Sequence, residues 1–166
     1  LAGRREEQLK ETAQACGDRT LIVPTDINTP ASIKNLFSQT LKTFGRLDYG
    51  HNNAGITNIQ SSEWDEDVWD RSLSINLTGV MHCMRAEVDA MLLSGGGAIV
   101  NTSSSSVWLG EADHVAYQAA KSGLTGLTRH TATVGGKHGV RCNLLAPGIV
   151  LTKSALRATS EDFRTK

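Results

Sequence analysis

Short apolar runs alternate along this chain with longer segments in which apolar residues recur every three or four positions. The short runs predict strands, and the longer segments predict amphipathic helices between them. The predicted strands are Thr20–Pro24, Leu47–His51, Ala98–Thr102 and Gly139–Leu145, preceded by the end of a buried strand at Leu1–Gly3. This alternation favours an α/β fold with a parallel sheet that is covered by helices on both faces.

Residue types mark where the predicted helices begin and end. Thr29 suits an N-cap, Pro30 the first helical position and Gly45 the helix end. Gly135 and Gly136 are expected to interrupt the last helix, at roughly 1 kcal/mol each relative to alanine. The predicted helices are Arg4–Cys16, Pro30–Phe44, Trp64–Leu93 and a run that opens at Ala116. No internal repeat or linker divides residues 1–166, so a single domain is expected.

Composition and charge limit the classes of partner. Lys plus Arg and Asp plus Glu each number 17, and the balance favours neither nucleic acid nor an anionic membrane as a partner. No apolar run is long enough to span a bilayer. Cys16, Cys83 and Cys142 lie far apart without a C-x-x-C pattern, which favours a reduced, cytoplasmic compartment. The five histidines lack metal-ligand spacing. A small-molecule partner is therefore expected, with no metal.

Tyr117 and Lys121 are separated by one helical turn, so their side chains emerge on the same face of the predicted helix. The pKa of a phenol is roughly 10, and a neighbouring cation lowers it toward the working pH. Such a tyrosine can exchange a proton with a carbonyl or alcohol oxygen. The same spacing also occurs on solvated helix faces, so the pair alone leaves two interpretations open.

This pair is one of five motifs that follow one another along the chain. They are Asn52-Asn53-Ala54-Gly55, Asn76 in Ile-Asn-Leu-Thr-Gly, Asn101-Thr102-Ser103-Ser104, Tyr117-x-x-x-Lys121 and Pro147-Gly148-Ile149-Val150-Leu151-Thr152. In this order and at these intervals the chain resembles the short-chain dehydrogenase/reductase family from Gly3 to about Thr152. The resemblance implies a Rossmann-like, doubly wound parallel sheet. It also implies an NAD(P)-dependent oxidoreductase that acts on an alcohol or carbonyl, as a homodimer or homotetramer that assembles through the helices of Asn76 and Tyr117.

The resemblance assigns four catalytic roles. Tyr117 would be the acid/base, and Ser104, thirteen positions earlier, would hold and polarise the substrate oxygen. Ser103, Ser105 and Ser106 are competitors for that role. Lys121 would favour the phenolate and bind the nicotinamide ribose. Asn76 would bind a water that links Lys121 to solvent; the alternative is a helix-interior amide satisfied by neighbouring backbone.

Cofactor contacts follow from the same resemblance. Asn52, Ala54 and Gly55 would let the backbone approach the adenosine ribose closely. Asp26 and Ile27 would lie beside the adenine, although Asp26 also suits a turn-capping role. Gly3 leaves no carboxylate where an NAD-preferring member has one, and Arg4 can pair with a 2′-phosphate, so NADP(H) is favoured and NAD(H) remains possible. The last group of predicted contacts is Pro147, Gly148, Ile149 and Thr152.

Two segments of the family pattern do not occur in the sequence. One is the glycine-rich T-G-x-x-x-G-x-G turn that follows the family's first strand and normally cradles the pyrophosphate. The other is the segment after Thr152 that ends in the last strand. In the order 3-2-1-4-5-6 the family's first two strands would separate Thr20–Pro24 from Leu47–His51, so both are expected to present open edges unless they pair directly.

Two functions are therefore weighed. The first is an NADP(H)-dependent oxidoreductase that interconverts a secondary alcohol and a ketone or aldehyde. The alternative is a non-catalytic, truncated chain that cannot hold the cofactor pyrophosphate. Trp108, Leu109 and Glu111 are expected to form a partly apolar pocket wall, and His114 could approach the substrate.

Overall fold

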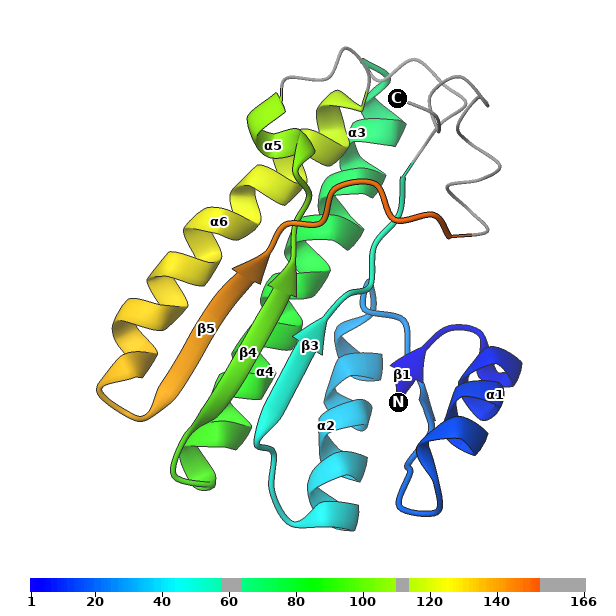
Figure 1. Ribbon diagram of the computed structural model, residues 1–166, viewed down its shortest axis with the longest axis vertical. Helices are drawn as coiled ribbons and strands as arrows, with labels where there is room; N and C mark the ends of the chain where they lie inside the picture. Colours follow the sequence, from blue (N-terminus) through cyan, green and yellow to red (C-terminus); the bar gives the residue numbers. More distant parts are fainter. Residues whose placement is uncertain (58–63, 110–113, 153–166) are drawn as a thin grey trace.

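The computed structural model describes residues 1–57, 64–109 and 114–152. A three-stranded parallel sheet with strand order β3-β4-β5 forms its centre: β3 (Tyr49–Asn52), β4 (Gly97–Thr102) and β5 (Val140–Leu145). The register pairs Asn52 with Asn101 and Thr102 with Leu145, so the carboxyl ends of all three strands reach the same edge (Figure 1).

A second, two-stranded parallel sheet lies beside the first. It pairs β1 (Ala2–Gly3) with β2 (Val23–Pro24). Helix α1 (Glu6–Cys16) connects these strands, and α2 (Pro30–Phe44) leads from β2 to β3. Within the described residues the two sheets do not pair, as expected for Thr20–Pro24 and Leu47–His51. One of the two strand positions expected between them is filled, because Ala2–Gly3 pairs with β2. The expectation that Thr20–Pro24 has an open edge on this side was therefore wrong. The gap therefore lies between β1 and β3 (Figure 1).

The predicted helix Trp64–Leu93 is made of three consecutive segments. These are α3 (Glu66–Leu73), a π-helical segment η1 (Ser74–Gly79) and α4 (Val80–Leu93). The Asp65 carboxylate caps the start of α3 by accepting from the backbone N–H of Asp67 and Val68. Asn76 lies within the π segment, and such segments are frequent at functional sites.

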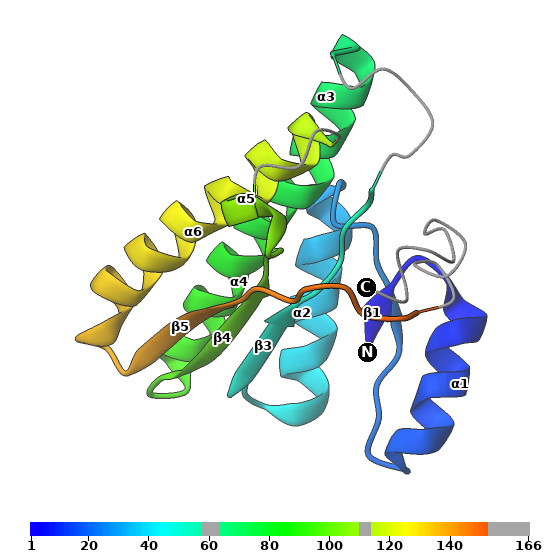
Figure 2. The same cartoon turned by 45° about the horizontal axis from the view of Figure 1, so that its top comes forward.

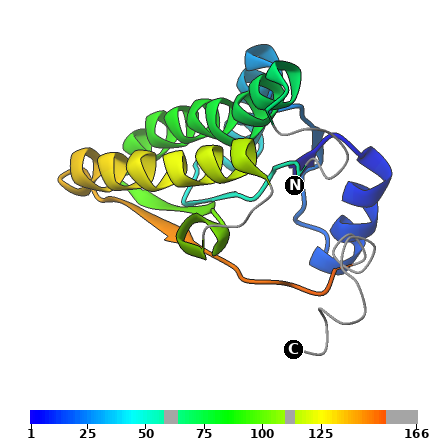
Figure 3. The same cartoon turned by 90° about the horizontal axis from the view of Figure 1, so that it is seen from above.

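The core lies between the three-stranded sheet and the helices on one of its faces. Helices α2, α4 and α6 (Val115–Gly136) lie along that face, whereas α1 lies on the other side of β1 (Figure 3). A short helix, α5 (Ser106–Leu109), follows β4 (Figure 2). The fully buried side chains that join these layers are Val80, Met91, Ile99, Leu124 and Val140.

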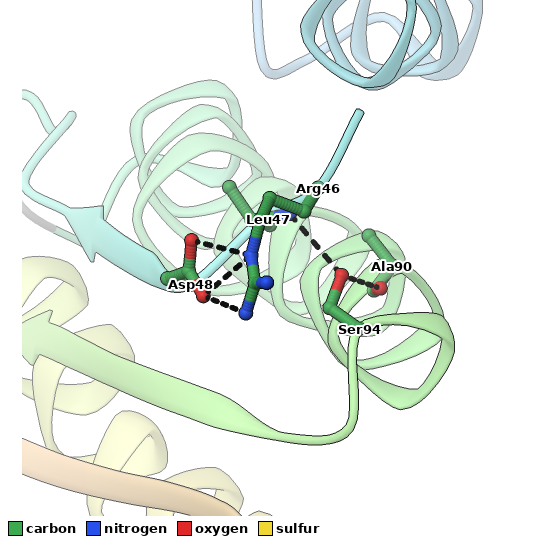
Figure 4. Close-up of polar contacts among 5 residues, drawn as sticks. All are labelled: Arg46, Leu47, Asp48, Ala90 and Ser94. Carbon is green, nitrogen blue, oxygen red and sulfur yellow. Dashed lines mark hydrogen bonds and ion pairs between the residues drawn. The ribbon is translucent and has the colours of Figure 1, made fainter. Parts of the chain in front are cut away.

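Polar contacts fix the amino end of β3, opposite the edge where the strands end. The Ser94 hydroxyl donates to the Ala90 carbonyl (3.2 Å) and accepts from the Leu47 backbone N–H (3.4 Å), which ties the approach to β3 to the end of α4 (Figure 4). Arg46 and Asp48 form an exposed ion pair in the same loop, with 2.7 Å between Nη2 and Oδ1.

Several predicted boundaries need correction. Only Val23–Pro24 of Thr20–Pro24 is paired, because its partner strand has two residues, and Leu47–His51 is shifted to Tyr49–Asn52. Gly135 and Gly136 do not interrupt the last helix but are its final residues. Thr29 has the extended backbone of an N-cap, yet its side chain makes no capping hydrogen bond, whereas Gly45 ends α2 in the left-handed conformation as predicted.

Candidate active site

Lys121, one of the predicted catalytic residues, is buried although it carries a charge. It lies on α6 with 3% of its surface exposed, and its Nζ donates to the Thr102 carbonyl at the end of β4 (2.7 Å). The same Nζ lies 5.6 Å from the centre of the Tyr117 ring, within the range of a cation–π contact. Desolvation by burial lowers the pKa of Lys121 to about 8. The spacing of the two residues therefore does place them together.

The four serines after β4 have different surroundings. Ser103 is buried, and its hydroxyl donates to the Lys121 carbonyl (2.9 Å), so it is committed to holding α6 against β4. Ser104 is half-buried, and its Oγ accepts from the Ser106 backbone N–H (3.2 Å) and lies 2.8 Å from the Ser106 Oγ. Because the Ser104 Oγ accepts both hydrogen bonds from Ser106, its own hydroxyl proton can point outward. This favours Ser104 over Ser103 as the group that meets a ligand.

Asn76 is fully buried, and its side chain is occupied by protein groups. Its Oδ1 accepts from the Ile56 backbone N–H (2.8 Å), and its Nδ2 donates to the Ile56 carbonyl (2.9 Å) and to the Ser72 hydroxyl (3.1 Å). A Cβ on Gly55 would come within 2.8 Å of this Oδ1. The amide thus behaves as in the alternative interpretation: it anchors the loop that follows β3.

The predicted adenosine-side contacts line a single cavity of about 500 Å³. It lies at the gap between the two sheets and contains residues from β1, the loop after β2, β3 and the loop after β3. The predicted residues in its wall are Arg4, Asp26, Ile27, Asn52, Ala54 and Gly55. Arg5 lies there as well. The rest of the wall comes from α1, α2, η1 and α4. The arginines and the small residues after β3 form the part of the wall that suits a phosphate-bearing nucleotide.

The predicted nicotinamide contacts are not part of this cavity. The segment after β5 runs toward α1 on the side of the sheet away from α4 and α6 (Figure 3). Its Pro147 carbonyl accepts from the Ser105 backbone N–H (2.9 Å), which places Gly148 beside the serine loop. Ile149 and Thr152 are exposed. Of the predicted pocket wall, Trp108 and Leu109 are exposed, and Glu111 lies outside the described residues.

Two buried polar residues near the site were missed by the sequence interpretation. Glu87 on α4 is only 4% exposed, and burial raises its pKa to about 7. Asn101 on β4 is fully buried and accepts from Asn52 Nδ2 (2.9 Å). One signal existed: Gly50 stands in a predicted strand where a side chain would normally pack.

Other features of the described residues do not add to the site. A larger groove of about 630 Å³ lies between α2 and α4, with a mostly apolar wall that contains none of the predicted site residues. Among residues 1–57, 64–109 and 114–152, no cluster of His, Cys, Asp and Glu could hold a metal ion. No helix in these segments is long and apolar enough to cross a membrane.

The sequence of the chain matches known proteins. The family model for short chain dehydrogenases matches residues 1–162. A short chain dehydrogenase/reductase of Aspergillus oryzae is 38% identical over 160 residues, which cover 95% of this chain and 61% of the relative. A 2,5-dichloro-2,5-cyclohexadiene-1,4-diol dehydrogenase of Sphingobium indicum is 36% identical over 165 residues, 98% of this chain and 66% of the relative.

A solved structure gives the same result. A provisionally assigned short-chain alcohol dehydrogenase from Sinorhizobium meliloti 1021 superposes with a TM-score of 0.86 at 34% identity, covering 98% of this chain and 65% of that one. Fold and sequence thus define a Rossmann-like α/β protein. The chain belongs to the short-chain dehydrogenase/reductase family. It spans about three fifths of the length of the Aspergillus relative.

Proposed function

We propose that this chain carries the site of an NADP(H)-dependent oxidoreductase that interconverts a secondary alcohol and a ketone or aldehyde. The observation that carries the proposal is the buried Lys121 ammonium. It is held by the Thr102 carbonyl and lies 5.6 Å from the centre of the Tyr117 ring, at the edge where the strands end. Removing a cation from water costs free energy. A buried cation beside a phenol is therefore an arrangement typical of a functional site.

Proton transfer is the work of the chain's own side chains. In the reducing direction Tyr117 donates the phenolic proton to the substrate oxygen, and in the oxidising direction the phenolate accepts it. The positive charge of Lys121 favours that phenolate. Ser104 donates a hydrogen bond to the same substrate oxygen, since Ser106 supplies donors to its Oγ. When bound, the nicotinamide supplies or accepts the hydride at the substrate carbon.

Asn76 is proposed to support proton exchange indirectly. Its side chain holds the Ile56 backbone and so fixes Gly55, whose added Cβ would approach Lys121 Nζ within 3.4 Å. In this proposal Lys121 passes the proton toward solvent, through a water that lies beside Asn76. Lys121 would also bind the nicotinamide ribose, next to Pro147, Gly148, Ile149 and Thr152.

The proposed cofactor preference is NADP(H) over NAD(H). Gly3 contributes no carboxylate to the cavity, and the guanidinium groups of Arg4 and Arg5 are in its wall. A guanidinium can bind a 2′-phosphate with two parallel hydrogen bonds, which is why it distinguishes the two cofactors. The enzyme is proposed to act in the cytoplasm as a homodimer or homotetramer, with the outer faces of α4 and α6 as the subunit contact.

One observation favours the non-catalytic alternative. Within the described residues β1 and β3 do not pair, so the cavity has walls from two separate sheets. A site of this kind depends on the gap staying at a fixed width. A measurement of cofactor binding therefore distinguishes the oxidoreductase from the non-catalytic alternative.

The experiment measures turnover of NADP⁺ with a panel of cyclic secondary alcohols, with NADPH binding followed by nicotinamide fluorescence. Tyr117→Phe is expected to lower turnover at least about 100-fold, since the proton donor is removed, while NADPH binding stays within about twofold. Tyr49→Phe, at an exposed position on β3, is the matched control and should retain turnover. Loss of NADPH binding in Tyr117→Phe, or full turnover without the phenol, would contradict the assignment.

Cofactor preference has its own test. Arg4→Ala should weaken NADPH binding about tenfold and leave NADH binding nearly unchanged, because only NADPH carries the 2′-phosphate. Arg46→Ala, which removes an exposed guanidinium at the far end of β3, is the control. An equal loss for both cofactors would show that Arg4 does not read the 2′-phosphate, and absence of NADPH binding to the unaltered chain would favour the alternative function.

A further inference from the structure

A buried polar network crosses the core directly beneath the cofactor cavity. Glu87 Oε2 accepts from Asn52 Nδ2 (2.8 Å), and the same Nδ2 donates to Asn101 Oδ1 (2.9 Å). Asn101 Nδ2 in turn donates to Thr128 Oγ1 (2.9 Å) and contacts Cys142 Sγ at 3.5 Å. The network therefore joins α4, β3, β4, β5 and α6.

Gly50 and Glu87 occupy complementary volumes. An added Cβ on Gly50 would lie 2.1 Å from Glu87 Oε1 and 2.5 Å from its Cδ, closer than non-bonded atoms approach. The carboxyl group thus takes the space where a strand residue would normally place a side chain. The exposed surface of Glu87 is 4%, and it lines the cofactor cavity.

The network acts at the ends of the two strands that contribute to the site. Asn52 and Asn101 are register partners across β3 and β4. Asn52 leads directly into the loop of Gly55, and Asn101 is followed by Thr102, whose carbonyl holds Lys121. Both amide hydrogens of Asn52 are used, so its orientation is fixed.

We propose that Glu87 is a positioning residue of the cofactor cavity. It fills the space left by Gly50, orients Asn52 and with it the carboxyl ends of β3 and β4, and makes the charge of the cavity respond to pH. The second part of this inference rests on the proposed cofactor-binding function.

The titration of Glu87 has a defined direction. Burial raises its pKa from 4.5 to about 7, so between these values the folded chain binds more protons than the unfolded chain. Stability therefore falls as pH rises through this window and stays lower above it. The thiols of Cys83 and Cys142 interact electrostatically with Glu87: burial, followed by the Glu87 charge, raises their pKa values to about 12 and 11. The other ionisable groups in the cavity wall are Arg4, Arg5, Asp26 and His51.

The first experiment compares thermal unfolding of the chain and of Glu87→Gln between pH 5 and 8. Glutamine keeps the shape and the acceptor for Asn52 but cannot ionise. The melting temperature of the unaltered chain should fall relative to Glu87→Gln by roughly 5 °C or more over this range. A difference that is constant with pH, or that has the opposite sign, would overturn the assigned titration.

The second experiment tests the Gly50–Glu87 pairing by a double-mutant cycle. Gly50→Ala should lower the melting temperature of the unaltered chain by several degrees, because the new methyl group displaces the carboxyl group. In a Glu87→Ala background the same substitution should cost little, since the space is then free. Equal costs in both backgrounds would overturn the pairing, and this result does not depend on any cofactor.

The third experiment measures the dissociation constant of NADPH at pH 6 and pH 8. Ionised Glu87 adds a negative charge to the cavity, so affinity for this polyanion should fall roughly threefold to fivefold in the unaltered chain. In Glu87→Gln that part of the pH dependence should vanish, because the other residues of the cavity wall are the same in both chains. Equal pH dependence in both chains would overturn the inferred response of the cavity's charge to pH. Absence of binding to either chain would contradict the proposed function, while the two stability experiments still decide the titration of Glu87 and its pairing with Gly50.

Discussion

The two sheets of this molecule differ sharply in how well their parts are buried. In the region of the three-stranded sheet, Ile99 and Val140 on the strands and Leu124 on α6 are fully buried. In the two-stranded sheet each strand has two residues, and α1 has no buried residue. The proposed proton-transfer residues belong to the first region, whereas Arg4 and Asp26 of the proposed cofactor site belong to the second. We therefore expect the region of the proton-transfer residues to resist local unfolding more than the region of Arg4 and Asp26.

The largest expected effect comes from matched leucine truncations in the two regions. Leu124→Ala removes a fully buried side chain and should lower the free energy of unfolding by about 2–5 kcal/mol. Leu9→Ala in α1 removes a half-buried side chain and should cost less than about 1.5 kcal/mol. Urea unfolding followed by circular dichroism measures both. Equal losses would mean that α1 is integrated into the core as firmly as α6.

A smaller effect is expected from the charge buried at Lys121. Its folded pKa of about 8 lies below the ordinary lysine value of 10.5, so the unfolded chain binds more protons between these values. Stability therefore rises with pH through that window. Relative to Lys121→Met, the unaltered chain should gain on the order of 2 kcal/mol between pH 7.5 and 10. Urea unfolding at both pH values measures this, with Lys42→Met at an exposed position as control. A flat difference would show that the ammonium is well solvated.

The smallest effects come from two glycines on α6. An added Cβ on Gly126 meets nothing within 4 Å, so Gly126→Ala should stabilise the chain by about 0.5–1 kcal/mol through helix propensity. Gly123 packs against Leu77, where a Cβ would lie 2.9 Å from Cδ1, so Gly123→Ala should destabilise by roughly 1 kcal/mol or more. Thermal unfolding of both variants measures the contrast. Stabilisation by both would mean that α6 packs more loosely than its contacts indicate.

Local patterns predicted those parts of the fold that depend on local physics. The spacing of Ile33 and its neighbours located α2, and Gly45 ends it in the left-handed conformation. Val80, Met84 and Met91 follow the same three-to-four spacing in their helix, and they are buried. The i, i+4 spacing likewise placed Tyr117 and Lys121 together.

Features that depend on tertiary contacts were not predicted. The π segment around Asn76 has the same three-to-four spacing as an α-helix, so periodicity does not distinguish them. Glu87 was missed because a glutamate on a helix is normally solvated, and only the space at Gly50 explains its burial. The hydrogen bond from Lys121 to the Thr102 carbonyl joins residues nineteen positions apart, on α6 and β4. No local sequence pattern predicts it.

The central claim is that NADPH binds in the cavity between the two regions and couples them. Amide hydrogen exchange of the chain with and without saturating NADPH tests this most directly. Without cofactor, the amides of α1, β1 and β2 should exchange much faster than those of α6. With cofactor, exchange in α1, β1 and β2 should slow at least about tenfold, while α6 changes little. Unchanged exchange in these elements at saturating NADPH would contradict the account.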